Sequence, residues 1–104
     1  MAEWIEVCAE AELPHGSRKI VRTDAGEIVV FNLNGSLYAM EDRCSHDGGE
    51  LASGELEADQ IICPRHGARF CIKTGKALTP PAYEDLEIFP VRIEAGLIQV
   101  DIDS

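Results

Sequence analysis

Closely spaced turn signals divide this sequence into short segments. Asn34-Gly35 lies between two apolar runs, and Glu94-Ala95-Gly96 separates another two. Asn-Gly between such runs is the strongest short-range signal for a β-hairpin. Further turns are expected at residues 23–26 and at Thr74-Gly75. The spacing predicts an all-β fold, a small antiparallel sandwich or barrel of about eight to ten strands.

The segment after Gly96 has the period of a strand. Three apolar residues there alternate with three polar ones, which are Ile98, Val100 and Ile102 against Gln99, Asp101 and Asp103. We expect one face of this strand to be buried and the other to be wet. No segment has a sustained helical period, and only residues 11–14 and 82–87 are candidates for a helical turn. A chain of 104 residues is expected to form one domain with one core.

The charge of the chain excludes some partners. Nineteen acidic residues against nine basic ones give a net charge of −10. This charge repels the phosphates of nucleic acids and of anionic membranes, so we expect neither as a partner. It suits docking on a positively charged protein, or simply keeps the chain in solution.

The location of the protein can also be anticipated. The first residues are acidic where a secretory signal is basic, and no run approaches the roughly twenty apolar residues of a membrane span. We therefore expect a cytoplasmic protein, a compartment in which disulfides are rare. Four cysteines in such a chain indicate metal binding or redox chemistry.

Two of the cysteines form pairs with two of the three histidines. One residue separates Cys44 from His46, and two residues separate Cys63 from His66. Each pair follows an expected strand, and loops on a rigid sheet are usual places for ligands. Thiolates and imidazoles bind both zinc and iron, so one zinc could take all four ligands, or a two-iron cluster could divide them. A mixed pair on each loop favours the cluster.

These pairs and their surroundings resemble the signature of Rieske [2Fe–2S] proteins. Pro64 and Gly67 lie beside the second pair, and the stretches HDGGE, CPRHGARF, TGKAL and LTPPAYEDL are similar to those of small soluble Rieske-type ferredoxins. The resemblance implies one [2Fe–2S] cluster per chain. It also implies that Cys44 and Cys63 bind one iron, and that His46 and His66 bind the other.

The same resemblance implies a domain organisation. Residues 1–104 would form a single Rieske domain, an antiparallel sandwich or barrel with a cluster-binding loop subdomain. The cluster-binding loops would span about 43–50 and 62–70, and a proline loop at about 78–84 would cover the cluster.

The sequence departs from the respiratory type of Rieske protein at four positions. That type has an additional cysteine on each loop, and the two cysteines form a disulfide; Gly49 and Arg65 occupy those positions here. Ala68 and Phe70 replace a serine and a tyrosine whose hydroxyls lie near the cluster. Hydrogen bonds to cluster sulfur stabilise the reduced state, so their absence predicts a low reduction potential.

No catalytic residues are expected. A mononuclear iron site of the oxygenase type needs two histidines, and only His15 remains outside the motif. There is no glycine-rich nucleotide fingerprint. The family likeness therefore implies an electron carrier between an NAD(P)H-dependent flavoprotein reductase and a terminal oxygenase or other redox acceptor. The alternatives are a ferredoxin-like protein linked to iron–sulfur assembly, and a zinc or cluster module with a structural or sensing role.

Two cysteines remain outside the motif. Cys8 lies in an expected edge strand and is interpreted as a small packing residue. Cys71 shares a strand face with Arg69 and Lys73, so we expect a partly exposed, free thiol.

Overall fold

The computed structural model of the chain describes residues 2–45, 48–80 and 82–103. This part contains three antiparallel sheets, so the predicted all-β class is confirmed. The ten strands are β1 (Trp4–Ala9), β2 (Arg18–Thr23), β3 (Gly26–Leu33), β4 (Ser36–Glu41), β5 (Leu56–Glu57), β6 (Gln60–Ile62), β7 (Arg69–Cys71), β8 (Ile88–Phe89), β9 (Val91–Glu94) and β10 (Leu97–Asp101).

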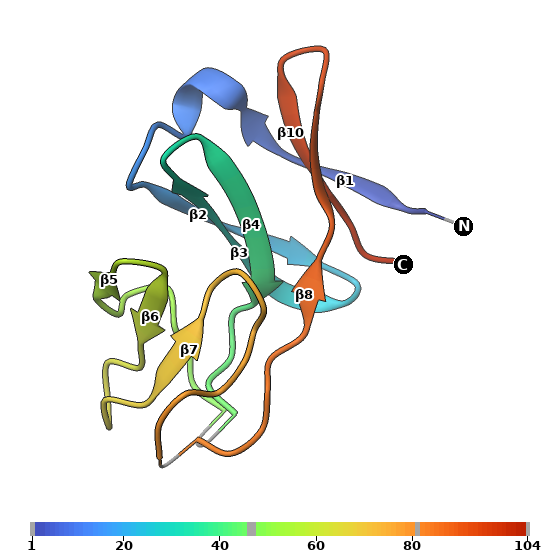
Figure 1. The fold of residues 1–104 in the computed structure, drawn as a ribbon. Coiled ribbons are helices and arrows are strands. Elements are labelled where there is room, and N and C mark those ends of the chain that lie inside the picture. Colours follow the sequence, from blue (N-terminus) through green and yellow to red (C-terminus); the bar gives the residue numbers. More distant parts are fainter. Residues whose placement is uncertain (1, 46–47, 81, 104) are drawn as a thin grey trace.

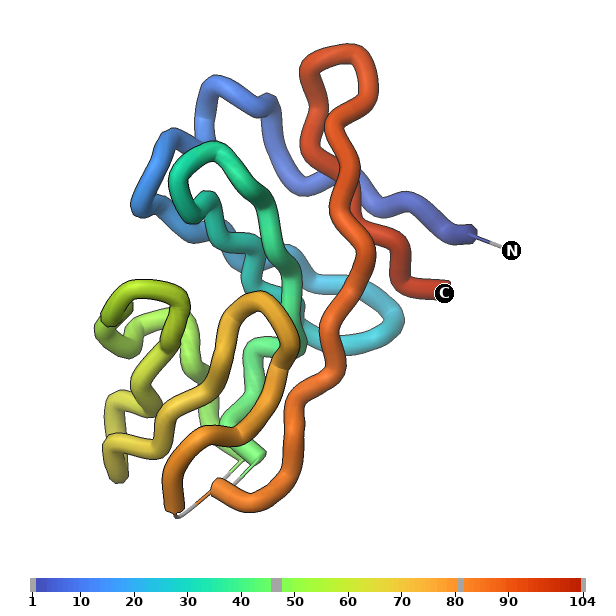
Figure 2. The backbone as a smooth tube through the Cα atoms, in the orientation of Figure 1, coloured from blue at the N-terminus to red at the C-terminus, as the bar shows by residue number. Residues whose placement is uncertain are grey.

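A four-stranded sheet in the order β2-β3-β4-β8 lies in the middle of the molecule (Figure 1). The sheet β1-β10-β9 lies at one end, and the sheet β5-β6-β7 lies at the other with the long loops around it. The first and last strands, β1 and β10, lie side by side because they pair with each other (Figure 2). The small sheet and its loops correspond to the predicted loop subdomain.

Two predicted hairpins form as expected. Asn34 and Gly35, with φ of 55° and 89°, connect β3 to β4. Ala95 and Gly96, with φ of 52° and 79°, connect β9 to β10. Positive φ at both central residues gives the turn a twist that matches paired strands, and Asn and Gly tolerate it best.

Strand β3 is buried on both faces, which contradicts the expectation of one core. Ile28 and Val30 pack with one group of residues, the distal core: Leu13, Ile28, Val30, Ala39, Phe89, Ile98 and Val100. Val29 and Phe31 point the other way into the loop core: Val29, Phe31, Met40, Cys44, Leu51, Ala52, Ile61, Cys63, Ala68, Phe70, Ile72, Ala82 and Leu86. Successive side chains of a strand alternate between faces, so one sheet separates two apolar clusters.

The prediction that the polar residues of β10 face solvent is wrong for Asp101. Its side chain is buried, and its Oδ1 accepts hydrogen bonds from the N–H groups of Glu3 at 2.8 Å and Asp103 at 3.0 Å. These bonds supply partners for a buried carboxylate, which would otherwise be costly.

Helical structure is minimal. A 3₁₀ turn at Glu10–Glu12 overlaps the first candidate turn, and residues 82–87 are not helical. Within the described residues, no helix is long and apolar enough to cross a membrane.

Candidate metal centre

The first predicted cluster loop, at about 43–50, follows β4 and contains Cys44. The Cys44 N–H donates to the carbonyl of Gly49 at 2.7 Å, and the Gly48 N–H donates to the carbonyl of Cys44 at 2.8 Å. Gly48 has a φ of 76°, in the left-handed region that favours glycine. Two backbone hydrogen bonds thus close a tight loop whose first residue is the cysteine.

The second predicted loop closes in the same way. Cys63 directly follows β6, and its N–H donates to the carbonyl of Ala68 at 2.7 Å. The Gly67 N–H donates to the carbonyl of Cys63 at 3.0 Å, and the φ of Gly67 is 75°. The two loops therefore share one backbone design, with a cysteine at the start and a left-handed glycine four positions later.

A third turn repeats this backbone design without a histidine. The Cys71 N–H donates to the carbonyl of Lys76 at 2.9 Å, the Gly75 N–H donates to the carbonyl of Cys71 at 2.7 Å, and the φ of Gly75 is 76°. No imidazole lies between Cys71 and Gly75. The same turn therefore occurs in this chain both with and without a histidine, and the histidine distinguishes the first two loops from the third.

The two motif cysteines are almost fully buried. Cys44 is 0% exposed and Cys63 is 1% exposed, and both belong to the loop core together with Phe70. His66, in contrast, is exposed. The structure therefore brings both thiols into one apolar environment, with an imidazole at the surface.

The fourth predicted ligand, His46, lies outside the described residues. Within the part that is described, no group of three or more His, Cys, Asp or Glu side chains is arranged to hold a metal ion. Two buried thiols and an exposed imidazole, on loops with the same backbone hydrogen bonds, are donors of the kinds that a Rieske-type cluster takes, namely thiolates on one iron and imidazoles on the other.

Asp42, which was not among the residues predicted from the sequence, supports the first loop. Its side chain is only 7% exposed, and its Oδ1 accepts the N–H groups of Leu51 at 2.8 Å and Ala52 at 2.9 Å. Its Oδ2 is buried without a hydrogen-bond partner among the described residues. The available signal was an acidic residue directly after an apolar strand and two positions before Cys44.

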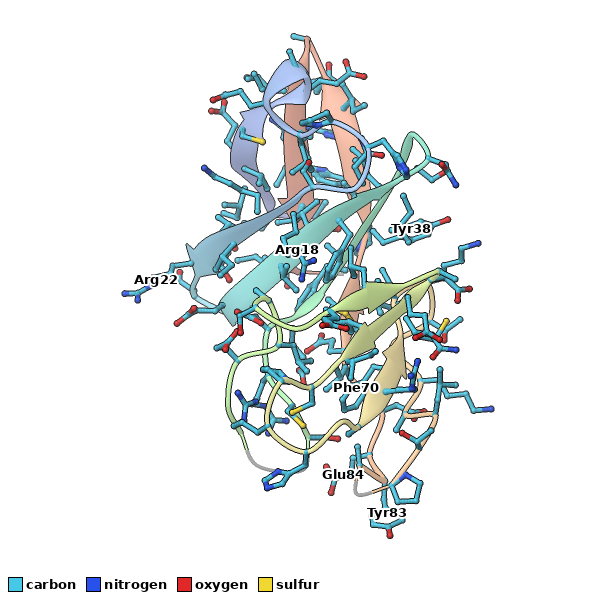
Figure 3. The ribbon with its side chains drawn as sticks, turned by 90° about the vertical axis from the view of Figure 1, so that its left-hand side faces the viewer. Arg18, Arg22, Tyr38, Phe70, Tyr83 and Glu84 are labelled. Carbon is cyan, nitrogen blue, oxygen red and sulfur yellow. The ribbon has the colours of Figure 1, made fainter. Side chains whose placement is uncertain are left out.

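Arg18, on strand β2 of the central sheet, binds the segment that follows the first loop. Its Nη1 donates to the carbonyls of Ala52 and Gly54, both at 2.6 Å, and its guanidinium lies 5.9 Å from the centre of the Phe31 ring. In Figure 3, Arg18 lies between the central sheet and the small sheet. It therefore links the loop subdomain to the rest of the molecule.

The predicted covering segment contacts the first loop. The Ser45 hydroxyl donates to the carbonyl of Glu84 at 2.7 Å, and Ala82 and Leu86 are buried in the loop core. Tyr83 is 82% exposed, and it lies with Glu84 at the outer end of the loop subdomain (Figure 3).

The two loops also meet through Gly49 and Arg65, where the family resemblance places a disulfide in the respiratory type. Nη2 of Arg65 donates to the carbonyl of Glu50 at 2.8 Å, and Nη1 lies 3.7 Å from Oε1 of Glu50. A Cβ added to Gly49 would lie 2.5 Å from Cζ of Arg65, so the guanidinium rests against this glycine.

The remaining candidates lie away from the loops. Cys8 is half-buried in β1, and burial, followed by the negative charge of Glu12, raises the pKa of its thiol. Cys71 is half-buried, as expected. His15 is exposed, and its Nδ1 accepts the N–H of Asn34 at 2.8 Å, so it supports a hairpin.

Comparison with known proteins gives a consistent result. Residues 3–90 match a family model described as the Rieske [2Fe-2S] domain. The 3-phenylpropionate/cinnamic acid dioxygenase ferredoxin subunit of Escherichia coli (strain K12) is 42% identical over 100 residues, which are 94% of this chain and 92% of the relative.

Solved structures are similar as well. A chain in the complex of reduced oxygenase and oxidized ferredoxin in carbazole 1,9a-dioxygenase is 33% identical with a TM-score of 0.88, and the match covers 94% of this chain and 92% of that chain. The ferredoxin of carbazole 1,9a-dioxygenase from Nocardioides aromaticivorans IC177 is 27% identical with a TM-score of 0.87, over 93% and 95% of the two chains.

Proposed function

Because the chain belongs to the Rieske [2Fe-2S] domain family, we propose that it is the ferredoxin component of a dioxygenase system and carries single electrons to a terminal oxygenase. The predicted family and the predicted [2Fe–2S] cofactor are confirmed by these matches. The curated relatives are named as ferredoxin subunits, so the chain is an electron-transfer component and not the catalytic oxygenase.

We propose that Cys44 and Cys63 bind one iron and that His46 and His66 bind the other. The observation that supports this assignment is that each motif cysteine is buried at the start of a loop that also contains a histidine, whereas Cys71, in the same kind of turn, is half-buried and has no histidine beside it. When bound, the cluster accepts one electron and gives it up again. The chain contributes thiolates from the apolar interior and, at His66, an imidazole at the surface.

The domain organisation is part of the same proposal. Residues 1–104 form one Rieske domain, the loops at about 43–50 and 62–70 hold the cluster, and the segment at about 78–84 covers it. The hydrogen bond from Ser45 to Glu84 supports this arrangement because it joins the covering segment to the first loop.

The electron donor is an NAD(P)H-dependent flavoprotein reductase in this proposal, and the system is cytoplasmic. A net charge of −10 favours partners with positively charged docking surfaces. An exposed His66 leaves the outer side of the site open to such a partner without unfolding. Electrostatic docking weakens as salt screens the charges, so electron transfer should slow as ionic strength rises.

Analysis of iron and acid-labile sulfide in protein purified without oxygen tests the cofactor. We expect two irons and two sulfides per chain, as a [2Fe–2S] cluster requires. One zinc without sulfide would contradict the electron-transfer function and favour a structural or sensing module.

Stopped-flow mixing of the reduced protein with an oxygenase component tests the acceptor. The oxygenase of the Escherichia coli 3-phenylpropionate system is a suitable probe because its ferredoxin subunit is 42% identical to this chain. Reoxidation should be faster with the oxygenase than without it, and added salt should reduce the difference. The same measurement can be repeated with the oxygenases of other dioxygenase systems. If none of these oxygenases makes reoxidation faster than in their absence, another acceptor is favoured, such as one in iron–sulfur assembly.

A further inference from the structure

The loop that contains Cys63 and His66 also carries an arginine that contacts the other loop. Arg65 lies between the two proposed ligands, and its side chain reaches Glu50 and Gly49 on the first loop. Its hydrogen bond to the Glu50 carbonyl, at 2.8 Å, joins residues 15 positions apart. A charged donor makes this kind of bond stronger than one between neutral groups.

The partner of Arg65 is itself held in place. Oε2 of Glu50 accepts the N–H of Ser53 at 3.0 Å, and Oε1 accepts the Ser53 hydroxyl at 2.7 Å. The hydroxyl bond, then the backbone bond, and more weakly the charge of Arg65 lower the pKa of Glu50, although burial opposes them. The carboxylate therefore stays ionised and oriented near the guanidinium.

The double glycine of the first loop has two separate structural reasons. Gly48 adopts a left-handed φ of 76°, which the turn requires. Gly49 has no such φ, but a Cβ there would lie 2.5 Å from Cζ, 2.7 Å from Nη2 and 2.9 Å from Nε of Arg65. Its lack of a side chain gives room for the guanidinium.

We propose that Arg65 is a positioning residue that clamps the second cluster loop to the first and slows loss of the cluster. This inference rests on the proposed function, since it assumes a cluster bound by ligands from both loops. A ligand that detaches rebinds faster when its loop is held next to the other, because the tether keeps the two halves of the site at a high effective concentration. Removal of the clamp should therefore accelerate iron release.

Arg65→Met removes the bonding groups and retains much of the apolar stem. We expect the purified holoprotein to release iron to an excess of chelator about tenfold faster, which corresponds to about 1.4 kcal/mol in the barrier. Arg65→Lys should recover part of the wild-type lifetime, since an ammonium can still donate to one carbonyl. The decay of the visible absorbance of the cluster gives the rate.

Gly49→Ala tests the same contact from the other loop and leaves Arg65 in place. The backbone of Gly49 accepts alanine without strain, and the atoms that the new methyl group would meet are the flexible end of Arg65. We expect the guanidinium to be displaced and iron release to accelerate as in Arg65→Met. The double variant should release iron no faster than Arg65→Met alone, because both changes break one contact.

Arg43→Met is the matched control. Arg43 also carries a positive charge next to a proposed ligand, Cys44, but it pairs with Glu41 on its own segment at 3.3 Å. Both methionine variants should lower the reduction potential, because each removes a positive charge that favours the more negative reduced cluster. Only Arg65→Met should accelerate iron release, which separates the clamp from the charge.

The clamp is excluded if Arg65→Met and Gly49→Ala release iron at the wild-type rate, or if Arg43→Met is as labile as Arg65→Met. Additive effects in the double variant would also overturn it, because they would mean that the two residues act separately. A wild-type protein without iron and sulfide would instead contradict the proposed function, so the two failures are distinguishable.

Discussion

The N–H of Gly75 donates to the carbonyl of Cys71 at 2.7 Å, just as the N–H of Gly67 donates to the carbonyl of Cys63 at 3.0 Å. The chain thus contains its own control for the ligand assignment. Cys63→Ser should abolish the stable cluster and reduce loop order, because ligation contributes folding free energy. Cys71→Ser changes the same residue type in the same kind of turn and should retain full iron and sulfide content. Loss of iron from Cys71→Ser would show that the proposed ligand set is wrong.

The second prediction concerns the reduction potential. We expect a midpoint near −150 mV, the low end of the Rieske range. Phe70 and Ala68 are fully buried in the loop core with both motif cysteines and carry no hydroxyl. Phe70→Tyr adds a hydroxyl that can donate a hydrogen bond to a cluster sulfur. If this hydrogen bond becomes stronger by roughly 1 kcal/mol on reduction, the reduction potential should rise by about 40 mV. Protein-film voltammetry measures the shift.

Ala68→Ser should shift the potential in the same direction, and the two shifts should approximately add unless both hydroxyls reach one sulfur. A hydroxyl that is seen on sulfur without any upward shift would refute the hydrogen-bond explanation. Solvent exposure and the charge of the chain would then have to account for a low potential.

The third prediction concerns Asp42. Asp42→Ala leaves the buried N–H groups of Leu51 and Ala52 without their acceptor, which should cost about 2–4 kcal/mol. A loss of this size should lower the thermal unfolding midpoint of the holoprotein by about 10 °C or more, measured by circular dichroism. Asp42→Asn retains an acceptor oxygen and should lose less. Asp24→Ala, at an exposed turn position, is the control and should change the midpoint little; an equal loss in both alanine variants would contradict the role of Asp42.

The fourth prediction concerns the pH dependence of Cys8. Burial and then Glu12 raise the pKa of its thiol, while Lys19 lowers it. A raised pKa leaves less of the reactive thiolate at neutral pH, so iodoacetamide should label Cys8 more slowly than a cysteine in an unstructured peptide. The labelling rate should continue to rise at a pH where the peptide has levelled off. At fixed pH, Glu12→Gln should accelerate the labelling of Cys8 and Lys19→Met should slow it, and peptide mass spectrometry can measure both rates. Slower labelling in Glu12→Gln and faster labelling in Lys19→Met would contradict this explanation.

Local signals were sufficient for the turns and for the metal motif. The hairpin at Asn34-Gly35 depends on positive φ at two adjacent residues, and the sequence itself shows residues that tolerate it. The cysteine and histidine of each Cys-x-His or Cys-x-x-His pair are likewise close in sequence, so the kind of metal ligand could be predicted from the sequence. The ligand set drawn from them stays a prediction.

Contacts between distant segments had no such local signal. Residues 28–31 of β3 form a continuous apolar run, and such a run does not show which sheets or loops cover the two faces of a strand, so the second core was not predicted. Asp101 appeared to be a wet-face residue, and only the neighbouring N–H groups of Glu3 and Asp103 make its burial favourable.

The sequence by itself determined the class of fold and the family, and it predicted the ligands of the candidate site, because these depend on residue type and short spacing. Only the tertiary structure decided how the loops are held. Arg18 reaches Ala52 across 34 positions, and Arg65 reaches Glu50 across 15. Such bonds form because folding brings separate segments within about 3 Å of each other, and no period or motif along the chain encodes which side chains will meet there.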